Sequence, residues 1–406
     1  MSKKQKAVVL GRNYASLLGM VRASGKAGCQ VTVIRTVRRI PETGTLKVKI
    51  KEMLTGAQPE SVSQYVEKYL YCRESKREEL VRLLLQEFGN ETEKVILLPT
   101  DDYTASTIDL YQEKLKEHFL FPHIRHEQGA IVKLMDKNVQ KKKAIASGLN
   151  VAKGWIIRIK DGEYEIPPDI AYPCFTKPEI SFLGNKRCMK RCNNPEELTE
   201  VIATQGNCPL LVEQYFEIEK EYAILGFSDG ENVIMPDIIQ MLLSGQGAHK
   251  GVTLKGIIRP LSAETELFKN LCDFIKSLQF TGLFDIDLFE SGGKVYFNEL
   301  NLRFGASGYS VTASGINLPE LLISCLKGEK INLNPPPKIR ESYFINEKVL
   351  LDDYENGYFT WEQYQEHKNC EGIHFIQSEE DPQPFIHFRR RERKDRLKAI
   401  AKGNRK

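Results

Sequence analysis

Carboxylates and a carboxamide recur at two-residue spacing within residues 282–305, GLFDIDLFESGGKVYFNELNLRFG. Asp285 and Asp287 lie two residues apart in one apolar run, and Glu299 and Asn301 lie two apart in the next. Alternate residues of a strand point to the same face of a sheet, so each pair can share one strand face. This spacing predicts a cluster of oxygen donors on a pair of strands.

A turn of the type that closes hairpins, Ser291-Gly292-Gly293, separates the two runs. Across such a hairpin, Asp287 can lie near Glu299 and Asn301, and an all-oxygen donor set suits a hard cation such as Mg2+. Arg303 follows on the same face and adds a cation that can bind phosphate. The simpler alternative is a hairpin with an ordinary polar outer face.

The first 125 residues predict an open parallel sheet. The apolar runs KAVVLG and CQVTVIRT flank a helical stretch, and a buried strand, VILLP, follows the helix-like KREELVRLLLQEFG. Such alternation is typical of α/β domains. The turn after KAVVLG, Gly11-Arg12-Asn13, does not predict a dinucleotide site, because GRNYASLLG lacks the GxGxxG spacing.

Two adjacent carboxylates, Asp101 and Asp102, follow the strand VILLP. Ligands bind at the carboxyl ends of strands in open α/β sheets, so these carboxylates can face a substrate amine. Equally, one of them can cap the helix that follows, TASTIDLYQEKLKEHF. The sequence leaves both interpretations open.

Residues 126–337 predict a second unit of α+β type, with a small lobe over about 150–216 and a large lobe over about 217–337. Asp136 and Lys137 lead a basic helix, VQKKKAIASGL, and the strand CFTKP carries Lys177. The next loop, EISFLGNKRCMKRC, contains glycine and cations and can close over a polyphosphate.

Residues 338–406 predict an appendage with a strand, YFINEKVLL, a polar helix, TWEQYQEHKN, and a basic tail. Residues 389–406 hold 10 basic and 2 acidic side chains, whereas the rest of the chain holds 48 and 52. The tail can contact an anionic lipid, polymer or nucleic acid, or it can be a solvated helix. The solvated helix is the simpler interpretation, so we expect no nucleic-acid partner.

The cysteine pattern and the hydropathy limit the cellular environment. Nine cysteines without a CxxC pair argue against a disulfide framework or zinc site and favour free thiols. No apolar run of about 18 residues is present, so we expect a cytoplasmic protein without a transmembrane segment. No Ser-His-Asp or Cys-His pattern indicates a protein nucleophile, and His249 alone is more typical of a structural or solvated side chain.

The order of these segments resembles the ATP-grasp superfamily. Over residues 6–330 the chain shows DK, FTKP, a basic loop, LLVEQYF, KEYA, DIDLF and NELNLR in that order. Within the superfamily it is most similar to carboxylate-amine ligases of the D-aspartate ligase and carbamoyl-phosphate synthetase-like group, partly through LPTDDYTASTIDLYQEKL. The resemblance implies an α/β (α+β) fold, with an N-terminal open parallel-sheet pre-ATP-grasp domain followed by two α+β lobes that clasp ATP.

The resemblance also implies roles for the residues that match the nucleotide site. Lys137 and Lys177 would hold ATP phosphates, with Lys177 also catalytic, and Lys186 would belong to a flap at residues 181–190. The loop GNKRCMKRC departs from the glycine-dense flap of the family. The residues implied for the adenine hinge and the ribose hydroxyls are Glu213, Phe216 and Glu221.

For the metal, the implied ligands are Asp287, Glu299 and Asn301, and Arg303 would be catalytic beside the transferred phosphoryl group. This agrees with the strand-face argument. Asp285 is the second choice for the metal, because of its spacing to Glu299.

The activity implied is that of an ATP- and Mg2+-dependent carboxylate-amine ligase, with Mn2+ able to replace Mg2+. A carboxylate, for example that of an amino acid, attacks the γ-phosphate of ATP, and an amine then displaces phosphate from the acyl phosphate. The implied partners are a small carboxylate and an amine, and the amine can also belong to a larger cell-envelope or carrier-bound precursor. A homodimer is common among the proteins that the chain resembles.

Two alternatives stay open. One is a carboxylase or carbamoyl-phosphate-type enzyme that uses bicarbonate, and the other is a nucleotide-binding module without catalysis. The intact set of Asp287, Glu299, Asn301 and Arg303 favours an enzyme over the binding module.

Overall fold

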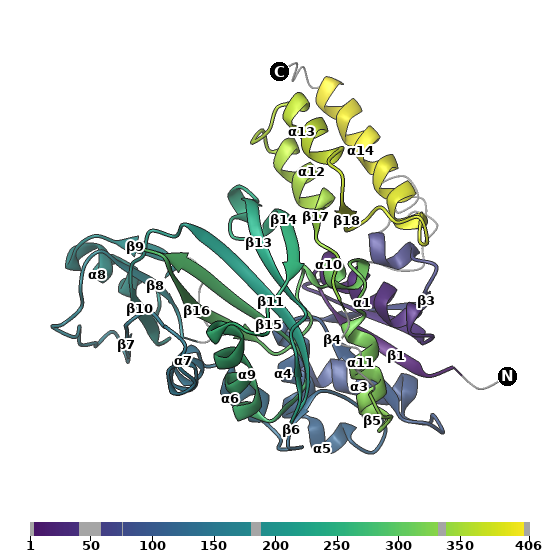
Figure 1. Cartoon of the computed structure of the whole chain (residues 1–406), viewed down its shortest axis with the longest axis horizontal. Coiled ribbons are helices and arrows are strands. Elements are labelled where there is room, and N and C mark those ends of the chain that lie inside the picture. The colour runs from purple at the N-terminus through teal and green to yellow at the C-terminus, as the bar shows by residue number, and fades with distance from the viewer. Residues whose placement is uncertain (1–3, 40–57, 75, 180–187, 332–337, 402–406) are drawn as a thin grey trace.

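The protein is described from a computed structural model. The structure describes residues 4–39, 58–74, 76–179, 188–331 and 338–401, with the backbone alone for residues 391 and 394–401. Within these ranges the strands form three sheets, of five, four and nine strands. The five-stranded sheet lies at the right of Figure 1, the four-stranded sheet at the far left and the nine-stranded sheet between them.

The N-terminal residues form a parallel sheet in the order β3-β2-β1-β4-β5. Its strands are β1 (Lys6–Gly11), β2 (Gln30–Val37), β3 (Val66–Arg73), β4 (Val95–Pro99) and β5 (Phe119–Leu120). Its helices are α1 (Tyr14–Lys26), η1 (Pro59–Val62), α3 (Arg77–Phe88), α4 (Asp102–Leu110) and α5 (Gln112–Leu115). All five residues of β4 are buried, as expected for a central parallel strand covered by helices. The predicted open parallel sheet is confirmed.

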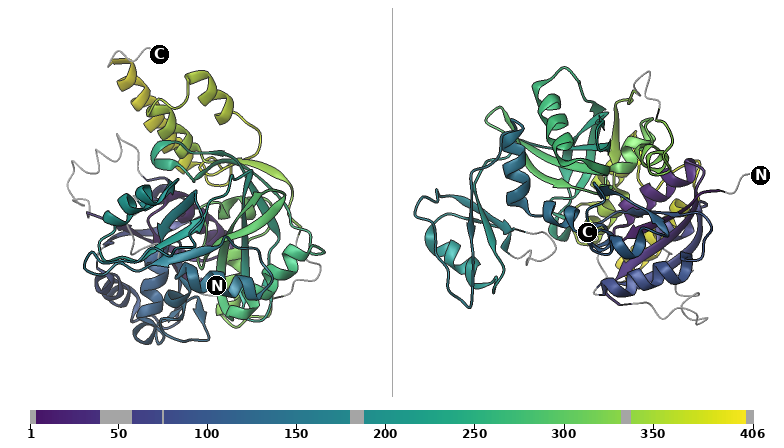
Figure 2. Two further views of the ribbon diagram at one scale, coloured as in Figure 1. Left: turned by 90° about the vertical axis from the view of Figure 1, so that its left-hand side faces the viewer. Right: turned by 90° about the horizontal axis from the view of Figure 1, so that it is seen from below.

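A small antiparallel sheet follows, in the order β7-β10-β8-β9. Its elements are β7 (Gly154–Ile157), β8 (Cys174–Pro178), β9 (Lys190–Cys192), α8 (Pro195–Ala203) and β10 (Leu210–Gln214). The side chain of Asn194 caps α8 by accepting from Glu197 N at 2.9 Å. Figure 2 shows that this sheet projects away from the rest of the molecule.

The large sheet runs in the order β16-β15-β11-β13-β14-β17-β18, with β12 beside β11 and β6 beside β15. Its strands are β6 (His123–Ile124), β11 (Lys220–Asp229), β12 (Val233–Ile234), β13 (Asp237–Ser244), β14 (Thr253–Pro260), β15 (Phe280–Ser291), β16 (Lys294–Asn301), β17 (Ser342–Ile345) and β18 (Ile373–His374). The helices of this region are α6 (Ala130–Leu134), α7 (Lys137–Ala146), η3 (Gly247–His249), α9 (Glu266–Leu278), α10 (Gly308–Ala313) and α11 (Leu318–Leu326). Because β6 comes from the first predicted domain and β17 and β18 come from the appendage, the large sheet draws on all three parts of the chain. The predicted domain bounds remain predictions.

One element predicted for the C-terminal residues was wrong in its second half. The predicted strand YFINEKVLL is a strand only at β17, and α12 (Glu347–Glu355) begins directly after Asn346, whose side chain accepts from Val349 N at 3.2 Å. Because the Asn346 side chain caps the helix start, the apolar residues that follow form a helix and do not extend the strand. The predicted polar helix is α13 (Trp361–Lys368), and the basic tail forms α14 (Gln383–Ala401).

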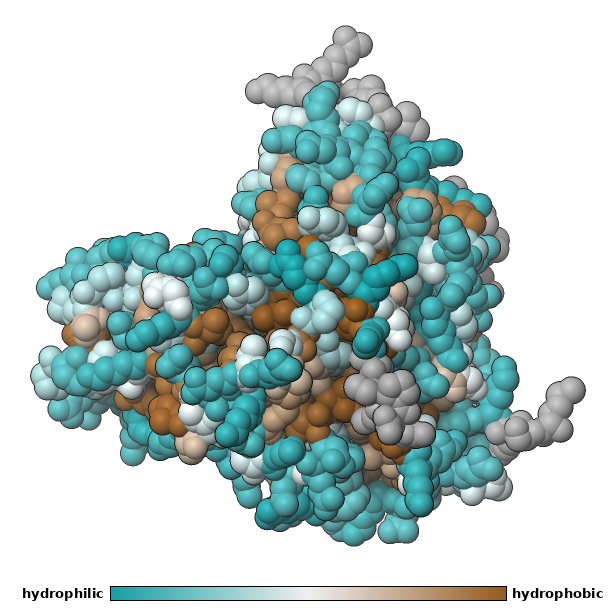
Figure 3. Space-filling model, viewed as in Figure 1, coloured by the Kyte–Doolittle hydropathy of each residue, from teal (hydrophilic) through white to brown (hydrophobic). Residues whose placement is uncertain are grey.

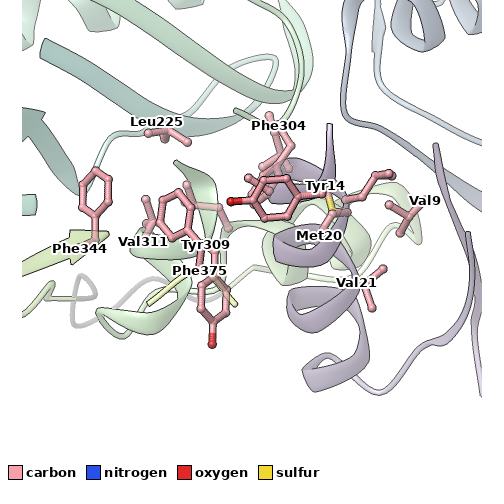
Figure 4. Packing of buried hydrophobic residues seen from close by; sticks show 14 of the residues in the cluster. Val9, Tyr14, Met20, Val21, Leu225, Phe304, Tyr309, Val311, Phe344 and Phe375 are labelled. Carbon is pink, nitrogen blue, oxygen red and sulfur yellow. The ribbon is translucent and has the colours of Figure 1, made fainter. Parts of the chain in front are cut away.

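A common apolar core joins the N-terminal sheet, the large sheet and the C-terminal residues. Figure 4 shows Tyr14 and Met20 of α1 packed close to Phe304, with Tyr309 and Val311 of α10 beside them. Apolar residues gather near the centre of the face seen in Figure 3, whereas the far left and the C-terminal helices are mostly hydrophilic. This shared core fixes the N-terminal sheet against the large sheet, and the candidate site lies where these two meet.

Candidate active site

The predicted hairpin is formed by β15 and β16. Asp287 pairs with Glu299, Asp285 pairs with Asn301, and the strands join at Gly292 and Gly293, whose φ angles are +58° and +71°. Glycine adopts these left-handed conformations without strain. Directly paired residues share one face of a sheet, so the oxygen donors gather as the two-residue spacing predicted.

The side chains of Asp287, Glu299 and Asn301 form a compact acidic cluster. Asn301 Nδ2 lies 3.2 Å from Asp287 Oδ2, and the ammonium of Lys137 lies 2.6 Å from Glu299 Oε1. Burial raises the pKa of Asp287 well above its usual range, and the charges of Asp285 and Glu299 raise it further. A divalent cation would relieve this repulsion, and the oxygen donors suit Mg2+.

The donor set is incomplete as a protein-only metal site. Among the described residues, no group of three or more His, Cys, Asp or Glu side chains is arranged to hold a metal ion. A cation here would therefore need the carboxamide of Asn301 and oxygens from a ligand such as phosphate, which is the usual situation for Mg2+ in nucleotide sites. Asp287, Glu299 and Asn301 therefore fit Mg2+ that is bound together with such a ligand.

Arg303 connects this cluster to the N-terminal sheet. Its Nε donates to Asp102 Oδ1 at 3.0 Å, and its Nη2 donates to Asn301 Oδ1 at 3.1 Å. Its Nη1 lies 3.7 Å from Asp285 Oδ2. Burial disfavours the charge, but Asp102 and Asp285 outweigh burial and raise the pKa of Arg303. The guanidinium is thus held as a fixed cation beside the acidic cluster.

Glu213 lies near the end of β10, between two buried lysines. Lys177 Nζ lies 2.8 Å from Glu213 Oε2, and Lys141 Nζ forms an ion pair with Glu213 Oε1. Burial alone would raise the pKa of Glu213, but Lys177 and Lys141 lower it below its usual range. Two cations and one anion leave a net positive site that suits a phosphate chain.

Two residues of this site escaped the sequence analysis. Lys141 lies four positions after Lys137, and this spacing puts both ammonium groups on one face of α7. Asn298 is the extra residue of a β-bulge between the Asp287 and Leu288 pairings, and its Oδ1 accepts from Lys177 Nζ at 3.0 Å. The i, i+4 spacing was visible in the sequence, whereas the bulge was not.

An aromatic cluster lies beside the end of β10. The ring of Phe216 lies 5.4 Å from that of Phe289 and 4.6 Å from that of Tyr296, between centroids. Glu221 pairs with Phe289 on the neighbouring strand. Phe216 and Glu221 are thus both neighbours of Phe289 on β15, and their roles toward adenine and ribose remain predictions.

The remaining residues considered in the sequence analysis lie outside the acidic cluster or outside the described residues. Lys186 lies outside the described residues. Asp101 is the N-cap of α4 and accepts from Thr104 N at 2.8 Å, which settles the helix-cap alternative for this residue. Asp102, one residue on, binds Arg303 instead of capping the helix. His249 lies 3.4 Å from Asp352, away from the acidic cluster.

Comparisons with known proteins identify the central region. The family model of the ATP-grasp domain matches residues 142–320, which include Lys177, Glu213 and the whole β15–β16 hairpin. Residues 142–320 form an ATP-grasp domain. Lys137, which contacts Glu299 of the hairpin, and Asp102, which contacts Arg303, lie before the matched ATP-grasp residues.

The relatives of this ATP-grasp domain act on different substrates. The large chain of carbamoyl phosphate synthase from Halobacterium salinarum is 24% identical over 202 residues, which are 47% of this chain and 19% of that protein. The chain therefore spans about a fifth of that relative's length. Two solved structures share the fold: N5-carboxyaminoimidazole synthetase from Staphylococcus aureus complexed with ADP, and L-amino acid ligase from Bacillus licheniformis. Their TM-scores are 0.59 and 0.56, each at 16% identity, with 89% and 84% of this chain and 88% and 80% of theirs covered.

None of the described helices is long and apolar enough to cross a membrane.

Proposed function

We propose that this protein is an ATP-dependent carboxylate-amine ligase that forms an amide-type bond and releases ADP and phosphate. The observation that carries the proposal is that three buried or half-buried cations, Lys137, Lys177 and Arg303, contact the hairpin of the acidic cluster or its end. Glu299 lies against Lys137, and Asn301 lies against Arg303. Lys177 reaches the same hairpin through Asn298. Such a set can hold a metal nucleotide at its phosphates and leaves the acidic cluster for the cation.

The phosphate chain of ATP would lie between α7 and β8, where Lys137, Lys141 and Lys177 neutralise its charge. In the proposal Glu213 keeps Lys141 and Lys177 in place before the nucleotide arrives, since it bonds to both. Glu213 and Phe216 would form the adenine hinge, and Glu221 would bind the ribose hydroxyls. Asp287, Glu299 and Asn301 would hold Mg2+, or Mn2+ in its place, and the bound ion supplies charge neutralisation at the transferred phosphoryl group.

The reaction has two balanced steps. An oxygen of the substrate carboxylate attacks the γ-phosphorus, the bond to the β-phosphate oxygen breaks, and ADP leaves. The amine nitrogen then attacks the acyl carbon. The bond between this carbon and the oxygen that carries the phosphoryl group breaks, phosphate leaves, and the nitrogen loses a proton. Arg303 is placed to stabilise negative charge on the transferred phosphoryl oxygens. The remaining task of the protein is to position the two substrates and exclude water.

The bicarbonate alternative keeps support from the comparisons, because two of the similar proteins are named as a carbamoyl phosphate synthase and an N5-carboxyaminoimidazole synthetase. In that alternative bicarbonate takes the place of the organic carboxylate, and the same cations serve. We propose the organic carboxylate first, because LPTDDYTASTIDLYQEKL is similar to carboxylate-amine ligases and because L-amino acid ligase also shares the fold over most of this chain. A larger cell-envelope or carrier-bound acceptor, a homodimer and a cytoplasmic location remain predictions.

The proposal is tested by ADP and phosphate release from MgATP across a panel of amino acids, other carboxylates and bicarbonate, each with and without pooled amines. Release that requires one carboxylate and one amine is the expected result. Release with bicarbonate alone would replace the first candidate by the second. Binding of MgADP without release from any pair would support the nucleotide-binding module.

A further inference from the structure

A buried glutamine on α7 bonds to the strand that carries the acidic cluster. Gln140 is 3% exposed, and its Nε2 donates to Leu300 O at 2.8 Å while its Oε1 accepts from Leu300 N at 2.9 Å. The same Nε2 also donates to Leu134 O at 2.7 Å. One side-chain amide therefore satisfies both main-chain groups of a single strand residue.

The position of β16 explains why this contact is needed. β16 is the end strand in the order of the nine-stranded sheet, with β15 as its neighbour on one side. The main-chain groups of an end strand that face away from the sheet need partners, because buried groups left unpaired are costly. At Leu300 the amide of Gln140 supplies both partners and so takes the place of a neighbouring strand.

Leu300 is the residue between Glu299 and Asn301, the two proposed metal ligands on β16. On the other side of the contact, Gln140 lies three residues after Lys137 and directly before Lys141, so all three face the same way on α7. Lys137 reaches Glu299, and Lys141 reaches Glu213 on β10. Gln140 is thus the central contact of a helix that brings two lysines to two carboxylates.

We propose that Gln140 is a positioning residue that sets the register of α7 against β16 and thereby the placement of Glu299, Asn301 and Lys137 around a metal nucleotide. The proposal rests on the proposed function of those three residues. Gln140 itself does not reach the ligand; it acts through the main chain of Leu300. Its effect should therefore depend on the divalent cation, because the residues next to Leu300 are the proposed ligands of that cation.

The test compares Gln140→Asn and Gln140→Leu with the wild type. Gln140→Asn keeps the amide but shortens it by one methylene, so it cannot pair with both groups of Leu300 in the same helix position. Gln140→Leu keeps the approximate volume and removes the amide. Should Gln140→Leu fail to fold, Gln140→Asn carries the test.

Asn150 offers a control residue that contacts the same strand, β16. Its Nδ2 donates to Val295 O at 3.0 Å, and its main-chain oxygen accepts from Phe297 N at 2.8 Å. Asn150→Ala therefore removes a side-chain bond to β16 that lies away from the proposed ligands. The Asn150 variant and the Gln140 variants all weaken side-chain contacts to β16, but only the Gln140 variants do so at Leu300.

Two readouts are needed, and neither depends on turnover. Calorimetry gives the affinity for ADP with Mg2+ and without it, and hydrogen exchange followed by mass spectrometry gives the protection of a peptide that covers residues 294–303. For Gln140→Asn we expect faster exchange in this peptide and an affinity for MgADP lowered about 10- to 100-fold, the usual range for residues that orient metal ligands. The affinity for ADP without Mg2+ should fall much less.

The outcomes separate this inference from the proposed function. Equal losses of affinity with and without Mg2+, or a loss of the same size in Asn150→Ala, would show that Gln140 is only structural and would overturn the inference. Wild-type affinity in Gln140→Asn would overturn it as well. If the wild type itself does not bind MgADP, the proposed function fails and the inference falls with it.

Discussion

Arg303 Nε donates to Asp102 Oδ1 at 3.0 Å, so the first residue of α4 in the N-terminal sheet domain holds the arginine of the acidic cluster. The two residues that precede Asp102 are also held in place. Thr100 Oγ1 donates to Leu10 O at 2.9 Å, and Asp101 caps α4. The N-terminal region thus contributes a rigid carboxylate to a site that lies mostly in the ATP-grasp domain.

Replacing Asp102 with Ala should lower kcat for ADP release about 10- to 100-fold, because a guanidinium displaced by about 1 Å no longer faces the reacting group. The KM for ATP should change little, since the lysines of α7 and β8 remain. Asp102→Asn keeps an oxygen acceptor for Arg303 Nε and should retain more activity. Glu74→Ala, which removes the partner of Arg12 near the same edge of the sheet, is the control. Unchanged kcat in Asp102→Ala would refute the positioning role.

Replacing Glu299 with Gln should abolish most ADP release while the fold remains. The substitution removes a proposed metal ligand charge and the ion pair with Lys137 but keeps the shape of the side chain. We expect a loss of at least about 100-fold in kcat/KM, as is usual when a metal site loses a ligand or its support. Glu290→Gln, on the same hairpin but paired with Lys220 and Tyr222, should be nearly silent. Wild-type turnover of Glu299→Gln at saturating Mg2+ would exclude Glu299 as a ligand.

Gly305 has no room for a side chain. A Cβ at this position would lie 2.2 Å from Asp285 Oδ2, so Gly305→Ala must displace the carboxylate that faces Arg303. We expect a loss of about 1–3 kcal/mol in the free energy of unfolding, the usual cost of overpacking. In an Asp285→Ala background the same change should cost less, because the clash is gone. A double-mutant cycle from urea unfolding measures this coupling, and strict additivity would contradict it.

The hairpin was predictable because it depends on local rules. Alternation with period two, a Ser-Gly-Gly turn and polar residues at fixed spacing were enough to place Asp287, Glu299 and Asn301 together. The pairing of β15 with β16 then followed without knowledge of the rest of the chain.

The contacts of α7 were not predictable in the same way. In the run VQKKKA, glutamine and lysines are typical of a solvated helix face, yet Gln140 and Lys141 are 3% and 6% exposed. They are buried only because α7 packs on β16 and beside β10, elements far away in the sequence. Likewise, Asp102 faces Arg303 across 201 residues of chain, and no local pattern separates it from the neighbouring helix cap.

The basic tail also contains a buried carboxylate, Glu392, which its mostly basic composition does not predict. Glu392 is 5% exposed; it accepts from Tyr364 Oη at 2.6 Å and forms an ion pair with Lys368, which is 9% exposed. Deleting residues 389–406 would leave Lys368 buried without this partner, which should cost about 3–5 kcal/mol. Deleting residues 394–406 keeps Glu392 and should cost much less. Thermal unfolding of both truncations decides this, and equal melting temperatures would show that the Glu392 pair is not needed.

The neighbouring His123 and His126, which lie before the ATP-grasp domain, should make stability depend on pH. Burial and, as the smaller cause, His126, whose ring centroid is 3.5 Å away, together lower the pKa of His123 to about 4. In the unfolded chain His123 binds its proton near pH 6.5.

Between these pH values the unfolded state therefore binds more protons than the folded state. The contribution to stability is complete above about pH 6.5 and is lost as the pH falls toward 4. Urea unfolding of His123→Leu across this range should show a shallower dependence of the free energy of unfolding on pH than the wild type. His126→Leu should lie between the two, because burial, the larger cause, remains. An identical slope in His123→Leu and the wild type would rule out His123 as the group that titrates.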